Sequence, residues 1–415
     1  MYNYKNIKQM HLEPSSLCNA ECPVCNRRLN GGPKNPVMTE RCITLDEFKE
    51  WFPVDFLKQL EQLTLCGNYG DPMTSPYLIE IISYFREINS TSSISMNTNA
   101  SGRDKKFWED LSEIMGERGR VVFSVDGLED TNHLYRKGTN WEKIMNAMTS
   151  FIGTGKSSLP WIGKATATWE FLVFEHNQHQ VAEARKLSEE MGFDKFYAKK
   201  AMGFNNVTSE TVRDYIDVLD NDGRLDYKIY APDNEWKNES MFKKPIQKSQ
   251  RNIDKTIILQ DVNINYDYSQ NNKITSVDTN TLNKLDGCEI NCIALYNEER
   301  RVWKMNPEGY HGIFVSSTGL VFPCCFVASK YHGSSSFETL QFREFVESYG
   351  EDTINLNKMG AIKNIIDSDI MKHGYVDRWN KPSIASGKLF TCSTFCGKGV
   401  NEEVRSTKKS ISGKA

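Results

Sequence analysis

Short apolar stretches alternate with amphipathic ones along the first half of the chain. Apolar and β-branched runs typical of buried strands occur at 5–17, 62–66, 93–97, 120–125, 164–174 and 195–198. Between them, apolar residues spaced three and four apart predict helices over 44–51, 76–85, 104–117, 141–152 and 178–191. Thr44 is the expected N-cap of the first helix. Strands and helices that alternate in this way predict parallel βαβ units and an α/β fold, built as an open or closed barrel.

The alternation weakens after about residue 205. Asn, Asp, Gln, Lys and Ser dominate much of the following stretch, which favours a linker or a surface insertion. From residue 287 the chain is rich in cysteine, and a strand–turn–strand pattern covers 312–323. The sequence thus predicts four parts: a barrel over 1–205, a linker or insertion over 206–286, a small α+β module over 287–400 and a flexible tail over 401–415.

Composition narrows the class of protein. The chain has 415 residues, of which 39% are hydrophobic and 25% charged, so it can bury real cores in two or three domains. Its net charge of −3 gives no case for a nucleic-acid surface or for an anionic membrane as partner. We find no export signal and no apolar run long enough to span a membrane, and therefore expect a cytoplasmic protein.

The eleven cysteines fall into groups, which favours metal sites in a reducing compartment over disulfides. Cys18, Cys22 and Cys25 lie within eight residues, directly after the first predicted strand. Soft thiolates at such spacing favour iron–sulfur or zinc chemistry. A closed zinc site takes four ligands, whereas three cysteines on a four-iron cluster leave one iron open to an outside molecule. A partial zinc site and unrelated free cysteines are the alternatives.

The spacing of these three cysteines, followed by α/β repeats, resembles the radical S-adenosylmethionine (SAM) superfamily over about residues 5–200. The resemblance implies a partial (β/α)6 barrel in which Cys18, Cys22 and Cys25 hold a 4Fe-4S cluster that binds SAM through its open iron. Reductive cleavage of SAM would then give a 5′-deoxyadenosyl radical, which abstracts hydrogen from a substrate. Val24 stands where the family commonly has an aromatic residue, a difference that alters packing rather than ligation.

Further matches lie at the ends of successive predicted strands. Tyr69-Gly70-Asp71-Pro72 is similar to the family's Gly-Gly-Glu-Pro turn near the SAM amino group, with Tyr69 in place of the first glycine and Asp71 in place of glutamate. Thr98-Asn99-Ala100 resembles the Thr-Asn-Gly found near the ribose. Ser124-Val-Asp-Gly resembles the Ser-Leu-Asp-Gly strand end, and Arg136 follows at the interval of an arginine that pairs with the SAM carboxylate. The resemblance therefore suggests a SAM site of Gly70, Asp71, Asn99, Ser124 and Arg136.

Six of the eleven cysteines lie after residue 287, and this region resembles the SPASM/twitch extension of radical SAM enzymes, a module that binds auxiliary iron–sulfur clusters. Six thiols favour one auxiliary 4Fe-4S cluster. The expected ligands are Cys292, Cys324, Cys392 and Cys396, with Cys288 and Cys325 as substitutes. A structural zinc ion is the alternative, since four thiolates suit either metal. The sequence does not decide which of Cys324 and Cys325 is the ligand.

The resulting hypothesis is an enzyme that abstracts hydrogen from a peptide or a small molecule, with the auxiliary cluster aiding substrate binding or electron transfer. Its catalytic side chains and its substrate stay unassigned. An external one-electron donor such as flavodoxin or ferredoxin would reduce the SAM-binding cluster. Modification of a nucleoside or base is an alternative, although no aromatic–basic cluster supports it. A non-catalytic iron–sulfur or zinc protein that binds a partner is the alternative from another class.

Overall fold

The computed structural model describes residues 2–154, 165–201, 204, 214–233, 285–290, 292, 311–331 and 337–397. The predicted tail at 401–415, most of the predicted insertion at 206–286 and part of the predicted module at 287–400 lie outside these residues. No helix in the described ranges is long and apolar enough to cross a membrane.

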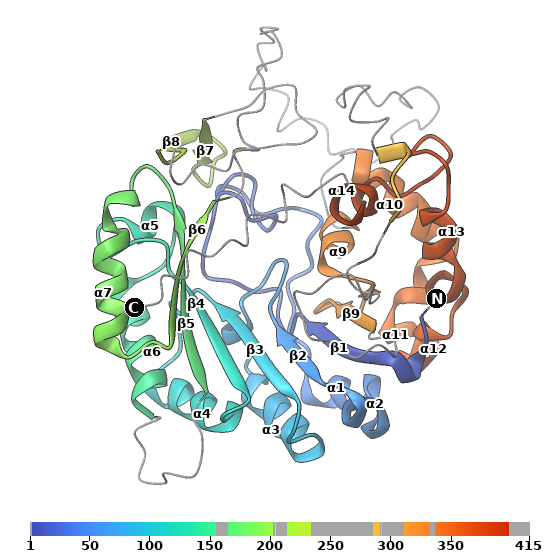
Figure 1. Ribbon diagram of the computed structural model, residues 1–415, viewed down its shortest axis with the longest axis horizontal. Coiled ribbons are helices and arrows are strands. Elements are labelled where there is room, and N and C mark those ends of the chain that lie inside the picture. The colour runs from blue at the N-terminus through green and yellow to red at the C-terminus, as the bar shows by residue number, and fades with distance from the viewer. Residues whose placement is uncertain are drawn as a thin grey trace, which may run out of the picture.

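A curved sheet of eight strands forms the centre of the protein, in the order β10-β9-β1-β2-β3-β4-β5-β6 (Figure 1). The first six strands pair in parallel in chain order, as strands joined by helical crossovers do. This arrangement confirms the predicted α/β fold with a partial (β/α)6 barrel. The strands of the sheet are β1 (Ile7–Leu12), β2 (Gln62–Leu65), β3 (Ser93–Thr98), β4 (Gly119–Ser124), β5 (Thr166–Val173), β6 (Lys195–Lys200), β9 (His311–Val315) and β10 (Val321–Phe322).

Helices of the N-terminal half cover the outer face of the sheet (Figure 1). Thr44 caps the first of them as predicted, because its side chain accepts the N–H of Glu47 while the Glu47 carboxylate accepts the N–H of Thr44. The helices of this half are α1 (Leu45–Trp51), α2 (Val54–Gln59), α3 (Leu78–Ile88), α4 (Lys105–Met115), α5 (Asn132–Tyr135), α6 (Trp141–Thr154) and α7 (Val181–Met191). The short helices α2 and α5 were not predicted, since neither is long enough for a helical repeat to show.

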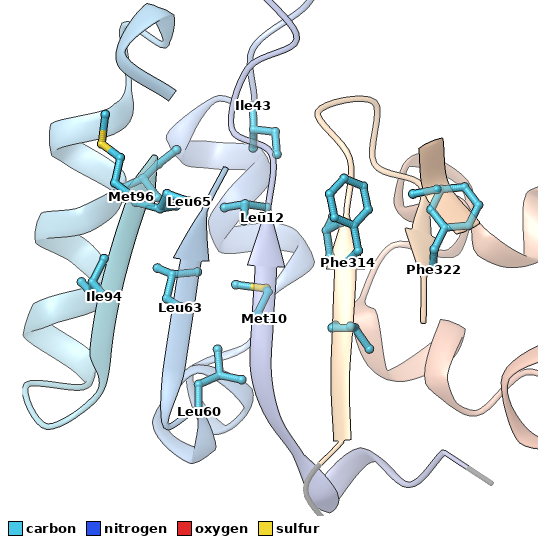
Figure 2. Close-up of a cluster of buried hydrophobic side chains, with 14 of the residues drawn as sticks. Met10, Leu12, Ile43, Leu60, Leu63, Leu65, Ile94, Met96, Phe314 and Phe322 are labelled. Atoms are coloured by element: carbon cyan, nitrogen blue, oxygen red, sulfur yellow. The ribbon is translucent and has the colours of Figure 1, made fainter. Parts of the chain in front are cut away.

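Alternate residues of the strands β2 to β5, with Ile7, Met10 and Leu12 of β1, belong to the main core. Figure 2 shows Met10 and Leu12 of β1 beside Leu63 and Leu65 of β2 and the neighbouring side chains of β3, β9 and β10. All of these labelled residues are buried in one cluster. Burial of a Leu, Ile, Phe or Met side chain stabilises the fold by roughly 1.5–3 kcal/mol. A slip of one residue would turn these side chains to the opposite face of the sheet, so they fix the register of the strands.

The opposite face of the sheet carries many polar side chains. In β5, for example, partly exposed Glu170 lies between buried Trp169 and Phe171, whereas on β9 the apolar Phe314 lies opposite His11. Polar or thiol side chains at such positions are Gln9, His11, Thr64, Cys66, Asn97, Ser124, Glu170, Tyr197 and Lys199. We call this face of the sheet the lumen.

The cysteine-rich C-terminal region joins the same sheet. Strand β9 pairs in parallel with β1, from the opposite end of the sequence, with His11 opposite Phe314. The predicted strand–turn–strand is the β9–β10 hairpin, in which Val315 lies opposite Val321. The helices that follow are α9 (Cys325–Tyr331), α10 (Phe337–Glu347), α11 (Leu356–Met359), α12 (Ile362–Ile366), α13 (Tyr375–Trp379) and α14 (Phe390–Cys396). They lie beyond β9, on the right of Figure 1.

A second hairpin lies within the stretch for which we expected a linker or insertion. Strands β7 (Tyr215–Leu219) and β8 (Leu225–Tyr230) pair antiparallel and form a sheet of their own. They lie above the carboxyl ends of the barrel strands (Figure 1). Each strand has only five or six residues, which is too few for an alternation of apolar and polar positions to stand out in the sequence.

Candidate cofactor-binding site

The three N-terminal cysteines occupy one loop at the carboxyl end of β1. The N–H of Cys25 donates to the carbonyl of Cys22 (3.1 Å), and the N–H of Glu21 donates to Lys137 (2.7 Å), which ties the loop to the chain after α5. Burial raises the pKa of Cys18 to about 12 and that of Cys22 to about 11, and it also raises the pKa of Cys25. Cys18 feels the charges of Cys22 and Cys25, and Cys22 feels that of Cys25, so the three thiols are neighbours. Buried thiols with a raised pKa keep their protons near neutral pH, and binding of a metal ion displaces these protons.

The segment Gly67–Asp71 packs against this loop, and we call it the SAM turn after the family turn that its sequence resembles. Gly70 has no room for a side chain, because a Cβ there would lie 1.7 Å from the carbonyl oxygen of Ser15. The N–H of Asp71 donates to the carbonyl of Leu17, next to Cys18 (2.8 Å). The missing side chain at Gly70 therefore lets the turn lie directly on the start of the cysteine loop.

Asp71 joins the SAM turn to the end of β3. Its carboxylate accepts the N–H of Asn99 (2.7 Å) and the N–H of Met73 (3.1 Å). Burial raises the pKa of Asp71, and these two donors oppose the rise. A contact of Asp71 with the amino group of SAM stays a prediction. In the structure each of its carboxylate oxygens holds a backbone donor, so Asp71 organises the turn.

Asn99 reaches the cysteine loop from the end of β3. Its side-chain N–H₂ lies 3.5 Å from the sulfur of Cys18 and 3.1 Å from the side-chain oxygen of Asn19. The next residue, Ala100, has a φ of 60°, in the left-handed region that favours glycine. Alanine here therefore adopts a backbone conformation that glycine takes at lower cost, at the position where the resembling Thr-Asn-Gly pattern has glycine.

Arg136 approaches the loop from the other side. Its Nη1 lies 3.8 Å from the sulfur of Cys22, and its Nε donates to the carboxylate of Asp126 (2.6 Å), which lies just after β4. Burial alone would lower the pKa of Arg136, but Asp126 and Cys22 raise this pKa by more than burial lowers it. The guanidinium therefore stays charged. Ser124 is the last residue of β4 and is partly exposed. Of the predicted SAM residues, Asn99 and Arg136 thus contact the cysteine loop through their side chains, and Gly70 and Asp71 through their backbone.

The hairpin β7–β8 covers the cysteine loop, a contribution that the sequence did not reveal. The hydroxyl of Tyr227 donates to the carbonyl of Leu134 (2.6 Å), and the N–H of Leu219 donates to Asn30 (2.9 Å). A Cβ at Gly32 would lie 2.5 Å from the carbonyl oxygen of Asp220, which shows how closely the two segments pack. The apolar cluster that joins them contains Ala20, Cys22, Tyr135, Phe174, Ile216, Val218 and Ile229.

Four C-terminal cysteines gather in a second buried group, at the far side of β9 from the barrel. Cys292 hydrogen-bonds Cys396 and feels the charges of Cys324 and Cys392, and these interactions together with burial raise its pKa well above the ordinary value. Burial and the neighbouring thiols raise the pKa of Cys324 to about 12 and also raise that of Cys392. These are the four residues predicted as auxiliary ligands, brought together from three separate parts of the chain.

The remaining cysteines have other surroundings. Cys288 donates to the carbonyl of Leu285 (3.0 Å). Cys325 is the residue whose charge most affects Cys66, at the end of β2. Of the adjacent pair, Cys324 lies with the four-thiol group, whereas the charge of Cys325 acts on Cys66 as well as on Cys324. Cys42 lies near Ser15, with its sulfur 3.3 Å from the Ser15 hydroxyl.

Both thiol groups have the chemistry of metal sites, although in the described part of the chain no three His, Cys, Asp or Glu side chains stand in ligating geometry. In the C-terminal group, the Tyr375 hydroxyl is buried without a hydrogen-bond partner among the described residues. The charges of Cys392, Cys324 and Cys292 all act on Tyr375, so this hydroxyl lies beside the thiols. Buried polar groups normally have partners, and a cluster or metal thiolate would give this hydroxyl an acceptor. The residues present therefore fit such a group.

Comparison with known proteins gives resemblance in structure alone. No family model matches the chain, and no curated protein matches its sequence. Among solved structures, Streptococcus suis SuiB bound to its precursor peptide SuiA is 13% identical, with a TM-score of 0.43 over 80% of this chain and 62% of SuiB. SuiB bound to S-adenosylmethionine is 12% identical, with a TM-score of 0.40 over 80% of this chain and 60% of SuiB. The chain thus spans about three fifths of the length of SuiB.

A second solved structure covers more of its own length. Native anSMEcpe with bound AdoMet is 15% identical, with a TM-score of 0.42 over 88% of this chain and 81% of anSMEcpe. These neighbours are radical SAM enzymes. At identities and TM-scores this low, the activity of this chain has to follow from its own residues.

Proposed function

We propose that this protein is a radical SAM enzyme, which binds SAM at the loop of Cys18, Cys22 and Cys25 and abstracts hydrogen from a polar substrate in the lumen. The observation that supports this most is a convergence of strand ends on one cysteine loop. Asn99, from the end of β3, meets Cys18, while Arg136, after β4, meets Cys22. The loops at the carboxyl ends of parallel strands are where α/β barrels carry their chemistry.

The charged groups around the loop match the two ends of an amino acid. Arg136 is a buried guanidinium, fixed by Asp126, and guanidinium suits the carboxylate of SAM. On the other side, the SAM turn offers backbone carbonyls and the Asp71 carboxylate, which suit its ammonium. A 4Fe-4S cluster held by the three cysteines would supply the electron that cleaves SAM. The packing of β7–β8 over the loop would keep water and oxygen from it.

The lumen supports a substrate that forms hydrogen bonds. Glu170 of β5 and Lys199 of β6 form an ion pair there, and both side chains are partly exposed, at 24% and 41%. An ion pair that is open to solvent contributes little to stability, so it is free to exchange its partners for charged groups of a ligand. We infer a peptide or a polar small molecule as substrate, with a protein of the flavodoxin or ferredoxin type as the electron donor.

The four-thiol group of Cys292, Cys324, Cys392 and Cys396 is the proposed site of an auxiliary 4Fe-4S cluster. This group lies close to the sheet, because Cys324 follows β10 of that sheet. The charge of the next residue, Cys325, acts on Cys66 at the end of β2. A cluster there would aid substrate binding or carry an electron away from the product. A zinc ion in the same thiols would serve the fold alone.

Anaerobic reconstitution with iron and sulfide, followed by SAM and dithionite, tests the proposal. We expect 5′-deoxyadenosine from the wild-type protein and none from Cys22→Ser. Cys42→Ser is the matched control, because Cys42 is outside both thiol groups, and it should form 5′-deoxyadenosine at the wild-type rate. A fully loaded, reduced wild-type protein that forms no 5′-deoxyadenosine refutes the enzyme and favours a non-catalytic metalloprotein.

Metal analysis of the same samples distinguishes the forms of the C-terminal site. About eight irons per chain indicate two four-iron clusters. About four irons with one zinc would assign the C-terminal thiols to a structural zinc ion and remove the auxiliary cluster from the proposal.

A further inference from the structure

The SAM turn lies between the two thiol groups and contacts both sides. On the C-terminal side it meets α9, the helix that begins directly after Cys324. The side-chain N–H₂ of Asn68 donates to the carbonyl of Cys325 (2.9 Å). The hydroxyl of Tyr69 donates to the carbonyl of Ser329, one turn further along α9 (3.1 Å). Two consecutive side chains of the turn thus hold two backbone groups of one helix.

On the barrel side the same turn is held by its backbone. The carboxylate of Glu13, which follows β1, accepts the N–H of Tyr69 (2.8 Å) and that of Gly70 (3.2 Å). Tyr69 is 5% exposed, although it lies in a loop. A displacement of α9 therefore reaches the turn through two short, part-buried side-chain contacts, and from the buried Tyr69 it passes to the backbone.

Tyr69 stands at the position where the related turn has glycine, and the structure shows what the side chain adds. Glycine has no side chain that could reach Ser329. The tyrosine at this position therefore gives the turn a hydrogen bond to the C-terminal module that glycine could not make. Because Cys324 and Cys325 are neighbours in the chain, ligation of Cys324 restricts the carbonyl that Asn68 holds. Contacts thus connect Cys324 to the cysteine loop. Helix α9, which follows Cys324, is held by Asn68 and Tyr69, and two residues later the N–H of Asp71 donates to Leu17, the residue before Cys18.

We propose that Asn68 and Tyr69 are positioning residues that couple SAM binding at the N-terminal thiols to occupancy of the C-terminal thiols. This inference rests on the proposed function, since it concerns the affinity of that site for SAM. Coupling between two sites is reciprocal, so a loaded C-terminal site would strengthen SAM binding and bound SAM would stabilise the loaded C-terminal site. If the two contacts served stability alone, they would affect folding but leave the two sites independent.

A double-mutant cycle on the affinity for SAM separates these two cases. Cys392→Ser prevents loading of the C-terminal site, and Asn68→Ala with Tyr69→Phe removes both contacts to α9 while it keeps the aromatic ring. The dissociation constant of SAM is measured by anaerobic equilibrium dialysis, without turnover. We expect Cys392→Ser to weaken SAM binding about tenfold in the otherwise wild-type chain, within the usual range of coupling between sites. In the chain that lacks the two contacts, the same change should weaken binding less than about twofold.

Controls keep each outcome decisive. Tyr77→Phe removes a hydroxyl from a nearby tyrosine outside the turn and should leave the tenfold effect of Cys392→Ser intact. If the double variant loses its N-terminal cluster, Tyr69→Phe alone serves instead and should reduce the effect of Cys392→Ser to about threefold. An effect of Cys392→Ser that is equally large with and without the contacts, or is absent from the wild-type chain, overturns the coupling. A loaded wild-type protein that binds no SAM at all refutes the proposed function and the coupling with it.

Discussion

The replacement Gly70→Ala is the most direct test of the geometry of the candidate site. A Cβ at this position would lie 1.7 Å from the oxygen and 2.5 Å from the carbon of the Ser15 carbonyl, and 2.7 Å from Cα of Ser16. These are backbone atoms, so no side-chain rotation relieves the contact. Either the SAM turn or the segment that leads to Cys18 has to move.

The expected cost follows from what that movement breaks. Extra atoms in a well-packed site cost roughly 1–3 kcal/mol. The turn would also lose the hydrogen bonds from Asp71 to Leu17 and from Gly70 to Glu13, at about 1 kcal/mol each. The total is about 4 kcal/mol. Because about 1.4 kcal/mol corresponds to a factor of ten, the affinity for SAM should fall by two to three orders of magnitude, about 100- to 1,000-fold.

Gly153→Ala provides the matched control. Gly153 lies near the end of α6, and a Cβ there would have no atom within 4 Å. Alanine is favoured over glycine within helices, so this variant should be more stable by up to about 1 kcal/mol and should bind SAM as the wild type does. Equilibrium dialysis gives the affinity, and thermal unfolding reports the fold. If Gly70→Ala is folded and binds SAM within about twofold of the wild type, close approach of the turn to Ser15 is not needed for the site, and the reasoning is wrong.

Three further predictions concern single interactions. Arg136→Ala should weaken SAM binding at least about tenfold, since it removes a charge held by Asp126; an unchanged dissociation constant from dialysis would remove Arg136 from the site. Tyr227→Phe loses the hydrogen bond of β8 to Leu134, about 1 kcal/mol, so bleaching of the iron–sulfur absorbance in air should be about fivefold faster, whereas equal rates would mean that the hairpin is no shield. Burial raises the pKa of Glu13 from 4.5 to about 7, so its protonated form stabilises the fold below pH 4.5, and that contribution is lost as the pH rises through about 7. Urea unfolding of metal-free Glu13→Gln should therefore show a smaller loss of stability between about pH 5 and pH 8 than the wild type, by up to about 3 kcal/mol; equal losses would contradict the raised pKa.

The sequence alone determined the features that depend on local order. The alternation of strands and helices over the N-terminal half predicted the parallel α/β barrel, because the period of apolar positions is set by each element separately. Thr44 marked the start of α1 for the same reason. The spacing of Cys18, Cys22 and Cys25 within one loop indicated their chemistry, since residues so close in the chain cannot lie far apart in space.

Only the tertiary structure decided which distant segments meet. Strand β9 joins the barrel sheet beside β1, which brings the C-terminal cysteines near the barrel, and no local pattern specifies a pairing between segments so far apart in the chain. The structure also shows that Cys324 lies with Cys292, Cys392 and Cys396, whereas the sequence did not decide between Cys324 and Cys325. The hairpin β7–β8 took its place over the cysteine loop through contacts with Tyr135 and Phe174, which a short strand does not encode by itself.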